Sequence, residues 1–238
     1  MKLYFLAFIC LITAFSAKSE VCNDYMLTLQ DFTELKVNDA INVEYRCSTD
    51  SAGMVFFRCE PDISSRLVFT SKNKCLSIQV DMLGMSNESL PTIRVYSSSL
   101  LKVENSADST LTIYNNDSVK NFKARIIGNG SLIIKNIKAK SIDAGINTGR
   151  GHLVISSATA DNVKLNNVGT GSIEAGNLEA KSVKVNLFGT GNIDCYASES
   201  ITIYGAGSGK VYYTGNPKKV INRSIGIDAI DINDISNK

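Results

Sequence analysis

The stretch Gly169-Thr170-Gly171-Ser172-Ile173-Glu174-Ala175 decides the fold, because it returns twenty residues later as Gly189-Thr190-Gly191-Asn192-Ile193-Asp194-Cys195. Five Gly-x-Gly triplets follow this rhythm, with first glycines 21, 20, 20 and 18 residues apart: Gly128/Gly130, Gly149/Gly151, Gly169/Gly171, Gly189/Gly191 and Gly207/Gly209. A unit that recurs at a period of about twenty residues is typical of stacked repeat architectures.

A short strand is expected directly after each triplet. Its second and fourth positions are apolar or aromatic in every copy, and the first position is polar: Leu132/Ile134, Leu153/Ile155, Ile173/Ala175, Ile193/Cys195 and Val211/Tyr213. A second alternating segment lies between successive triplets, with one polar residue between two inward positions: Lys123, Asp143, Lys164, Lys184 and Thr202. Alternation with a period of two over a short run predicts a β-strand with one buried face.

Each repeat therefore consists of a strand, a turn, a second strand and a glycine corner. Leu101/Val103 and Leu111/Ile113 fit the same template, with Ala107-Asp108-Ser109 in place of the glycine triplet. We therefore predict an all-β fold, a parallel β-helix or closely related β-solenoid with about six coils of roughly twenty residues. Stacked at about 4.8 Å per coil, the inward residues would form one continuous apolar core.

Composition excludes several classes of function. The chain has 238 residues, is 44% apolar and carries a net charge of +2. Its Lys, Arg and Tyr residues are scattered, which argues against a nucleic-acid partner. It contains no Cys-x-x-Cys pair, so we expect no zinc or redox chemistry, no other metal and no cofactor.

The N-terminus has the features of a secretory signal peptide. Met1-Lys2 is followed by an apolar run from Leu3 to Phe15 and by small residues, which predicts a signal peptide over residues 1–19 and no transmembrane segment after cleavage. Five cysteines would remain, so at least one is unpaired in an oxidising compartment. Cys195 falls on an inward position, and Cys22, Cys47, Cys59 and Cys75 allow two disulfides of undetermined connectivity.

We expect residues 20–238 to form one continuous domain. Residues 24–100 lack the glycine rhythm but are rich in alternating segments, and we predict that they form the strand-rich opening layers or N-terminal cap. The regular coils occupy residues 101–215, and residues 216–238 form a C-terminal cap.

The third, outward position of the first strand holds the best candidates for a site. Stacking in register would place Glu174 and Asp194 about 5 Å apart, with Tyr212 in the next coil. That spacing suits a retaining glycosidase pair or a calcium ion, although two solvated carboxylates are the more common outcome. Ile133 and Val154, in the same column, predict either cover by the N-terminal strands or a subunit contact.

Two further candidates lie elsewhere in the repeats. Lys164 and Lys184 stack in the outward column of the second strand, which suits a weak surface for an anionic glycan. His152 is the only histidine and has no orienting partner that can be identified in the sequence, so we expect no Ser-His-acid triad.

These motifs resemble the head GIN domain family of autotransporter-type adhesins, exported proteins of Bacteroidetes. The resemblance begins at Phe32-Thr-Glu-Leu-Lys-Val-Asn-Asp-Ala-Ile-Asn-Val, continues through Leu90-Pro-Thr-Ile-Arg-Val-Tyr96 and the serial glycine triplets, and ends at Gly207-Ser-Gly-Lys-Val-Tyr-Tyr-Thr-Gly-Asn-Pro217. It implies a right-handed β-helix and a cell-surface or periplasmic role, and it supplies no catalytic residue. The middle residues of the triplets (Asn129, Arg150, Thr170 and Thr190) depart from the Ser-Gly-Ser-Gly turns usual in that family.

The first functional expectation is a non-enzymatic binding or adhesion module that is exported to the periplasm, the outer-membrane surface or the extracellular space. It would present flat faces to a glycan or an envelope protein, with ligand contacts from Glu174, Asp194, Tyr212, Lys164 and Lys184. The alternative is an enzyme that acts on polysaccharide through Glu174 and Asp194. The uniformly short turns argue against the enzyme, because a β-helical polysaccharidase needs a cleft built from long loops. Weak self-association through the apolar outer positions is a third possibility.

Overall fold

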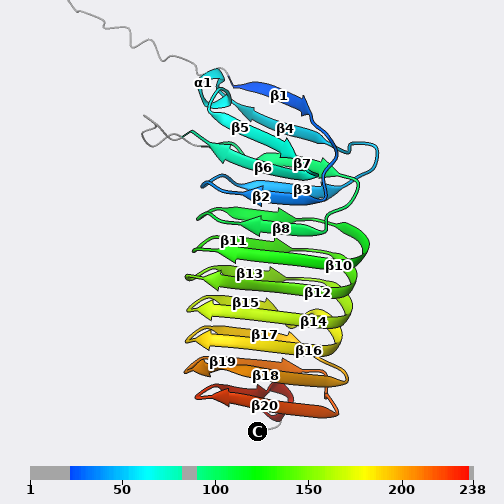
Figure 1. Cartoon of the computed structure of the whole chain (residues 1–238), viewed down its shortest axis with the longest axis vertical. Helices are drawn as coiled ribbons and strands as arrows, with labels where there is room; N and C mark the ends of the chain where they lie inside the picture. The colour runs from blue at the N-terminus through cyan, green and yellow to red at the C-terminus, as the bar shows by residue number, and fades with distance from the viewer. Residues whose placement is uncertain (1–21, 82–89, 236–238) are drawn as a thin grey trace, which may run out of the picture.

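The computed structural model describes residues 22–81 and 90–235, so the expected signal peptide lies outside the described residues. The chain winds through two long sheets that face each other (Figure 1). Sheet A holds, in spatial order, β1 (Asn23–Thr28), β4 (Met54–Cys59), β7 (Ile93–Ser97), β3 (Val43–Cys47), β9 (Thr110–Ile113), β11 (Ser131–Ile134), β13 (His152–Ile155), β15 (Ser172–Ala175), β17 (Asn192–Tyr196), β19 (Lys210–Thr214) and β21 (Asp228–Asp231).

Sheet B holds, starting from the C-terminal end of the stack, β20 (Lys219–Ile225), β18 (Ser200–Gly207), β16 (Leu178–Gly189), β14 (Ala158–Gly169), β12 (Ile137–Thr148), β10 (Asn116–Ile127), β8 (Lys102–Asn105), β2 (Glu34–Val37), β6 (Cys75–Val80) and β5 (Leu67–Lys72). Two short helices complete the described chain, α1 (Pro61–Ser64) and α2 (Ile232–Ile235). Neither described helix is long and apolar enough to cross a membrane.

The stacked coils confirm the predicted all-β solenoid. Strands β9, β11, β13, β15, β17 and β19 pair in parallel, each one coil below the last. Leu132 lies over Leu153, Leu153 over Ile173 and Ile173 over Ile193, and each of the four side chains is at most 1% exposed. At about 1.5–3 kcal/mol for each fully buried side chain, this inner row and its equivalent in sheet B supply most of the stabilisation.

The glycine corners of successive coils lie directly over one another, with Gly169 paired to Gly189 and Gly189 to Gly207. Gly169 and Gly189 have φ angles of +126° and +130°, a region that L-residues with a side chain rarely adopt. A Cβ added at Gly189 would lie 2.2 Å from the carbonyl oxygen of Gly169, one coil away. Only glycine therefore allows successive corners to approach at the spacing that the strands require.

The N-terminal third extends the same two sheets. β2 pairs in parallel with β8, and β3 with β9, so these two strands form a coil stacked on the regular repeats. β6 pairs in turn with β2, and β7 with β3, so the coil of β6 and β7 lies on the far side of the β2–β3 coil, away from the regular repeats. β1 and β5 then add antiparallel edges. Because these strands continue the sheets, they do not lie across the outer face of the coils. Cover of Ile133 and Val154 by the N-terminal strands, one of the two expectations, is therefore wrong, and both side chains stay half-buried on the outer face.

At the other end a C-terminal cap was expected over residues 216–238, and the described part of that range, residues 216–235, contributes one further strand to each sheet. β20 pairs in parallel with β18, and β21 with β19.

The cysteines behave as separate side chains. Cys22, Cys59 and Cys75 carry free thiols, the thiol of Cys47 donates a hydrogen bond to the carbonyl of Ser98 at 3.2 Å, and Cys195 is buried as expected.

Candidate functional site

The five candidate residues lie on two different sheets. Glu174, Asp194 and Tyr212 belong to β15, β17 and β19 of sheet A, whereas Lys164 and Lys184 belong to β14 and β16 of sheet B. The fold therefore does not bring the acidic and basic candidates together, and each face has to be considered separately.

On sheet A the predicted register is confirmed. Val154 pairs with Glu174, Glu174 with Asp194 and Asp194 with Tyr212. The carboxyl groups of Glu174 and Asp194 thus lie on neighbouring strands of the same face.

His152 joins this pair, a contact that the sequence analysis missed. Its Nε2 lies 2.8 Å from Oε1 of Glu174, although its register partner is Ser172. The contact is diagonal, from one coil to a position two residues further along the next. The sequence held one signal for it, since Glu174 is stacked over Val154 and His152 lies two residues before Val154 on the same face.

Asp194 is the least solvated member of the cluster. Burial raises the pKa of its carboxyl above the ordinary value, and the negative charge of Glu174 raises it further. Its Oδ1 is buried and has no hydrogen-bond partner in the described chain. Gly176 makes room for this carboxyl group, because a Cβ at that position would lie 2.5 Å from Oδ2 of Asp194.

This cluster can hold a proton and can accept hydrogen bonds from hydroxyl groups. The calcium alternative gains no support from a third ligand, since no three His, Cys, Asp or Glu side chains in residues 22–81 and 90–235 are placed to hold a metal ion.

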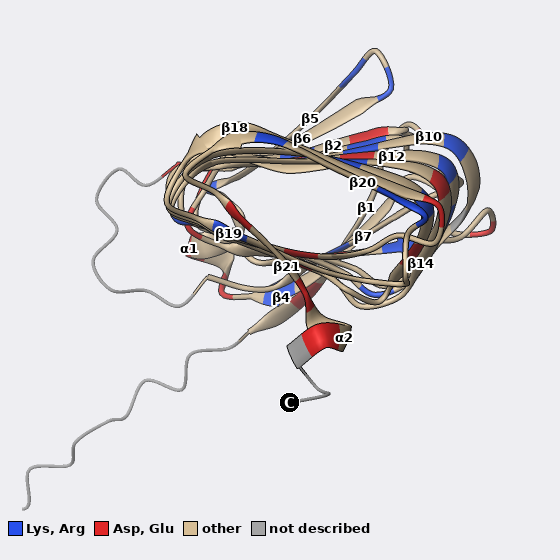
Figure 2. Cartoon of the chain, turned by 90° about the horizontal axis from the view of Figure 1, so that it is seen from below, with Lys and Arg blue, Asp and Glu red and all other residues tan. Residues whose placement is uncertain are grey.

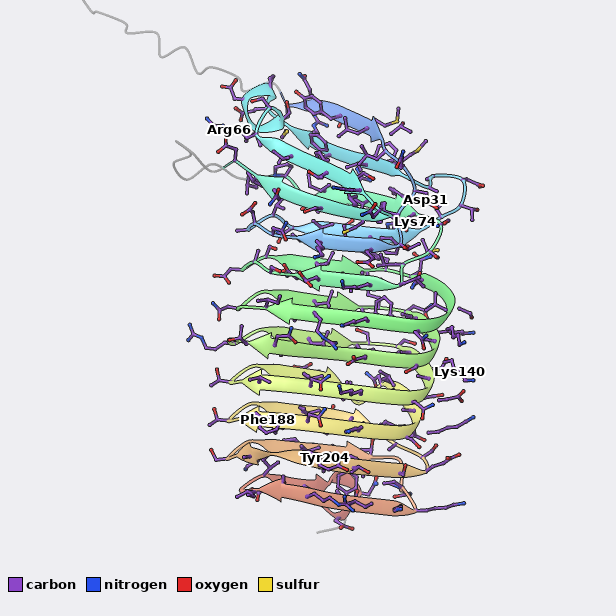
Figure 3. All side chains as sticks on the ribbon, in the orientation of Figure 1. Asp31, Arg66, Lys74, Lys140, Phe188 and Tyr204 are labelled. Carbon is purple, nitrogen blue, oxygen red and sulfur yellow. The ribbon has the colours of Figure 1, made fainter. Side chains whose placement is uncertain are left out.

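On sheet B a shallow groove of about 300 Å³ crosses the outer face of β12, β14, β16 and β18. Its polar lining comes from three outward columns: Ser141, Asn162, Ser182 and Ser200 in the first, Lys164, Lys184 and Thr202 in the second, and Tyr204 in the third. Both lysines predicted for an anionic ligand are therefore neighbours in a groove. Figure 3 shows Tyr204 on β18, near the C-terminal end of the stack.

The two lysines of the groove carry uncompensated charge. Neither Lys164 nor Lys184 forms an ion pair within the described residues. The nearest acid in their column, Asp143, instead accepts a hydrogen bond from Nη2 of Arg125 at 2.6 Å. The Lys184 ammonium lies 4.9 Å from the ring centre of Tyr204, a cation–π contact that fixes the ring beside the charge.

Side chains along the groove are held by contacts between coils. The hydroxyl of Ser200 donates to that of Ser182 at 3.0 Å. Asn186 donates through Nδ2 to Oδ1 of Asn166 at 2.7 Å, and Asn166 donates to Asp143 at 2.9 Å. These bonds form a ladder beside the lysine column and hold the serine and asparagine side chains that take part in them.

Comparison with known proteins adds two findings. A model of the family described as "Putative auto-transporter adhesin, head GIN domain" matches residues 31–217. No curated protein matches the sequence.

Several solved structures share the fold. A "putative adhesin" from Bacteroides fragilis is 22% identical, with a TM-score of 0.79 over 89% of this chain and 96% of that one. A "putative adhesin" from Parabacteroides distasonis is 16% identical, with a TM-score of 0.69 over 89% and 98% of the two chains. A "putative lipid binding protein" from the same species is 19% identical, with a TM-score of 0.66 over 88% and 97%. At these identities the similarity establishes the fold alone.

Proposed function

Because the chain belongs to the head GIN domain family, we propose that it is a non-enzymatic adhesion module that is exported to the cell envelope and binds an acidic glycan in the groove of sheet B. The partner class is inferred from the chemistry of the groove. Export, to the periplasm, the outer-membrane surface or the medium, is inferred from the family and from the N-terminal residues.

The observation that carries this proposal is that Lys164 and Lys184 line one groove with Tyr204 and form no ion pair within the described residues. Ammonium groups bind carboxylate or sulfate as point charges that tolerate many ligand orientations. A tyrosine ring offers an apolar face to the carbon-bound hydrogens of a sugar and a hydroxyl at its edge. Successive strands are about 4.8 Å apart, so an extended chain lying along the solenoid would meet new polar groups at every coil.

Hydroxyl and amide groups complete the recognition surface. Ser182 and Ser200 on one side, and Asn166 and Asn186 beside the lysines, both donate and accept hydrogen bonds. Such groups suit the hydroxyls of a sugar better than a lipid tail or an apolar peptide. Because the surface is shallow and wet, we expect modest affinity for each site, with a strong dependence on salt.

Binding to immobilised glycans tests the proposal. The purified protein should bind uronate-containing or sulfated polysaccharides in preference to neutral ones, and 0.5 M salt should weaken the binding. Replacing Lys164 and Lys184 together by alanine should reduce the affinity at least tenfold. The matched control is Lys138→Ala, an exposed lysine on β12 outside the groove, which should bind like the unaltered protein. Equal binding by the double variant would refute the assignment of the groove.

Glu174, Asp194 and Tyr212 form a second proposed contact surface, of opposite charge and on the other sheet. Their carboxyl and hydroxyl groups would accept and donate hydrogen bonds to neutral sugar hydroxyls, and would repel an acidic chain. Glu174→Gln with Asp194→Asn should therefore leave binding of acidic glycans unchanged and weaken any contact with neutral ones.

The enzyme alternative has one observation in its favour. A carboxyl group with a raised pKa next to a second carboxyl group is the arrangement that glycosidases use for an acid and its partner. Asp194, whose pKa is raised by burial and by the charge of Glu174, lies next to Glu174 on the neighbouring strand. However, the side chain of Glu174 is 59% exposed and already pairs with His152, so the pair is open to solvent. Release of reducing ends from a polysaccharide panel, abolished by Glu174→Gln, would establish the enzyme and overturn the binding module.

A further inference from the structure

The two ends of the solenoid are finished differently. At the N-terminal end the outermost strands are β1 and β5, and each pairs antiparallel with its neighbour, β1 with β4 and β5 with β6. At the other end β20 and β21 are the outermost strands of the two sheets, and no strand of the described chain pairs with their outer edges. The view onto this end shows α2 beside β21 and not across it (Figure 2).

An unpaired edge strand is a template for pairing with another chain, and proteins normally cover it or blunt it. Here the edge is accompanied by exposed apolar side chains. Val220 and Ile225 on β20 are 44% and 78% exposed, and Ile225 is the most exposed of the large apolar side chains in the described residues. The end therefore has both the backbone groups and the apolar surface of an interface.

The charges at this end are separated by sheet. β20 carries Lys219 and Arg223, and β21 carries Asp228 and Asp231 (Figure 2). Lys219, Arg223 and Asp228 are exposed and form no ion pair in the part of the chain that the structure describes. A surface with a basic strand on one side and an acidic strand on the other is complementary to a second copy of itself.

We propose that two copies of this chain associate tail to tail, with β20 of each copy pairing with β21 of the other. The chain turns at each corner, so β20 and β21 run in opposite directions on opposite sides of the end. A two-fold axis across the end, parallel to the strands, then places β20 antiparallel to the partner's β21, and the same contact occurs twice. This arrangement sets the basic strand β20, with Lys219 and Arg223, against the partner's acidic strand β21, with Asp228 and Asp231. Within each copy Oδ1 of Asp231 also accepts hydrogen bonds from N and Nδ2 of Asn233.

The alternative two-fold axis would pair β20 with its own copy and β21 with its own copy. That arrangement would place basic residues against basic residues and acidic against acidic, which is unfavourable. The charge pattern therefore selects one of the two possible symmetric contacts. The dimer would carry one sheet B groove on each side. Only the binding of glycan at both grooves rests on the proposed function, and the dimer contact itself does not.

Sedimentation velocity at several protein concentrations tests the contact without any ligand. The unaltered protein should form dimers whose fraction rises with concentration and falls with salt. A β20 variant, Lys219→Glu with Arg223→Glu, and a β21 variant, Asp228→Lys with Asp231→Lys, should each weaken the dimer at least tenfold, because every contact would become a like-charge contact. Mixed in equal amounts, the two variants should restore dimers.

The matched control is Lys138→Glu, which reverses an exposed charge on β12, far from this end, and should dimerise normally. Circular dichroism of each variant checks that the coils are intact. A monomer at every concentration would overturn the proposal, and so would dimerisation of the β20 variant at the affinity of the unaltered protein. Failure of mixing to restore dimers from two folded variants would overturn the assignment of β20 to the partner's β21.

Discussion

Replacing Gly189 with alanine tests the close stacking of the glycine corners. The residue has a φ angle of +130°, and an added Cβ would lie 2.2 Å from the carbonyl oxygen of Gly169, 3.0 Å from its carbonyl carbon and 3.2 Å from its nitrogen. All three are backbone atoms of the preceding coil, so relief requires the two coils to separate and not merely a side chain to turn.

The expected loss of stability combines three terms. A residue with a side chain in a sparsely populated backbone region costs about 1–3 kcal/mol. Forcing an extra carbon into a packed site costs about 1–3 kcal/mol more. Alanine also restricts the unfolded chain, which offsets about 0.4–1 kcal/mol of this loss. We therefore expect Gly189→Ala to lower the free energy of unfolding by about 1–6 kcal/mol.

Gly128 provides the matched control, because it shares the backbone strain but not the contact. Its φ angle is +110°, and the nearest atom to an added Cβ is Oδ1 of Asp108 at 3.9 Å. Gly128→Ala should therefore cost at most about 2.5 kcal/mol, from the backbone term less the offset from the unfolded chain. The difference between the two variants measures the contact between coils.

Urea denaturation followed by circular dichroism gives both free energies. For a chain of this size each kcal/mol corresponds to about 2–4 °C in Tm, so thermal denaturation should rank the variants in the same order. If Gly189→Ala and Gly128→Ala destabilise the protein equally, within about 0.5 kcal/mol, the corners do not limit the spacing of the coils and the reasoning fails.

Two further predictions concern titratable groups. Because the pKa of Asp194 is raised in the folded protein by burial and by Glu174, the folded state binds more protons than the unfolded state above about pH 4, and its stability falls as the pH rises through the raised value. Asp194→Asn should flatten the profile of Tm against pH in this window and raise Tm at pH 7, and an unchanged profile would contradict the assignment. Burial raises the pKa of Cys195 to about 12, so iodoacetamide should label the exposed Cys22 in the native protein but Cys195 only after denaturation. Native labelling of both at similar rates, read by mass spectrometry, would show that this interior position is open.

Much of the fold could be predicted because a stacked repeat makes register a matter of counting. The period of about twenty residues placed Leu132, Leu153, Ile173 and Ile193 in one column, and the structure buries them in that column. The same counting placed Asp194 beside Glu174, and β15 and β17 pair the two residues in that register. Period-two alternation then assigned each residue to the inner or outer face.

The candidate site was predictable only in part, because counting along the repeat gives the register and nothing more. Register indicates which residues stack directly, but it does not indicate which side chains reach across diagonally. The contact between His152 and Glu174 depends on the rotamers of both side chains, which a repeat pattern does not specify. The contact between the Tyr204 ring and the Lys184 ammonium could not be predicted for the same reason, because Tyr204 lies in the neighbouring column.

The sequence alone determined the repeat, the burial of each coil position and the strands that follow the glycine corners, because glycine spacing and apolar alternation are local properties of the chain. Only the tertiary structure decided that β2 and β3 lie between the β6–β7 coil and the β8–β9 coil, because parallel strands without a repeat signal carry no local mark of their neighbour. It also decided that β20 and β21 keep open edges. These features depend on how the coils close around the core, which no single segment encodes.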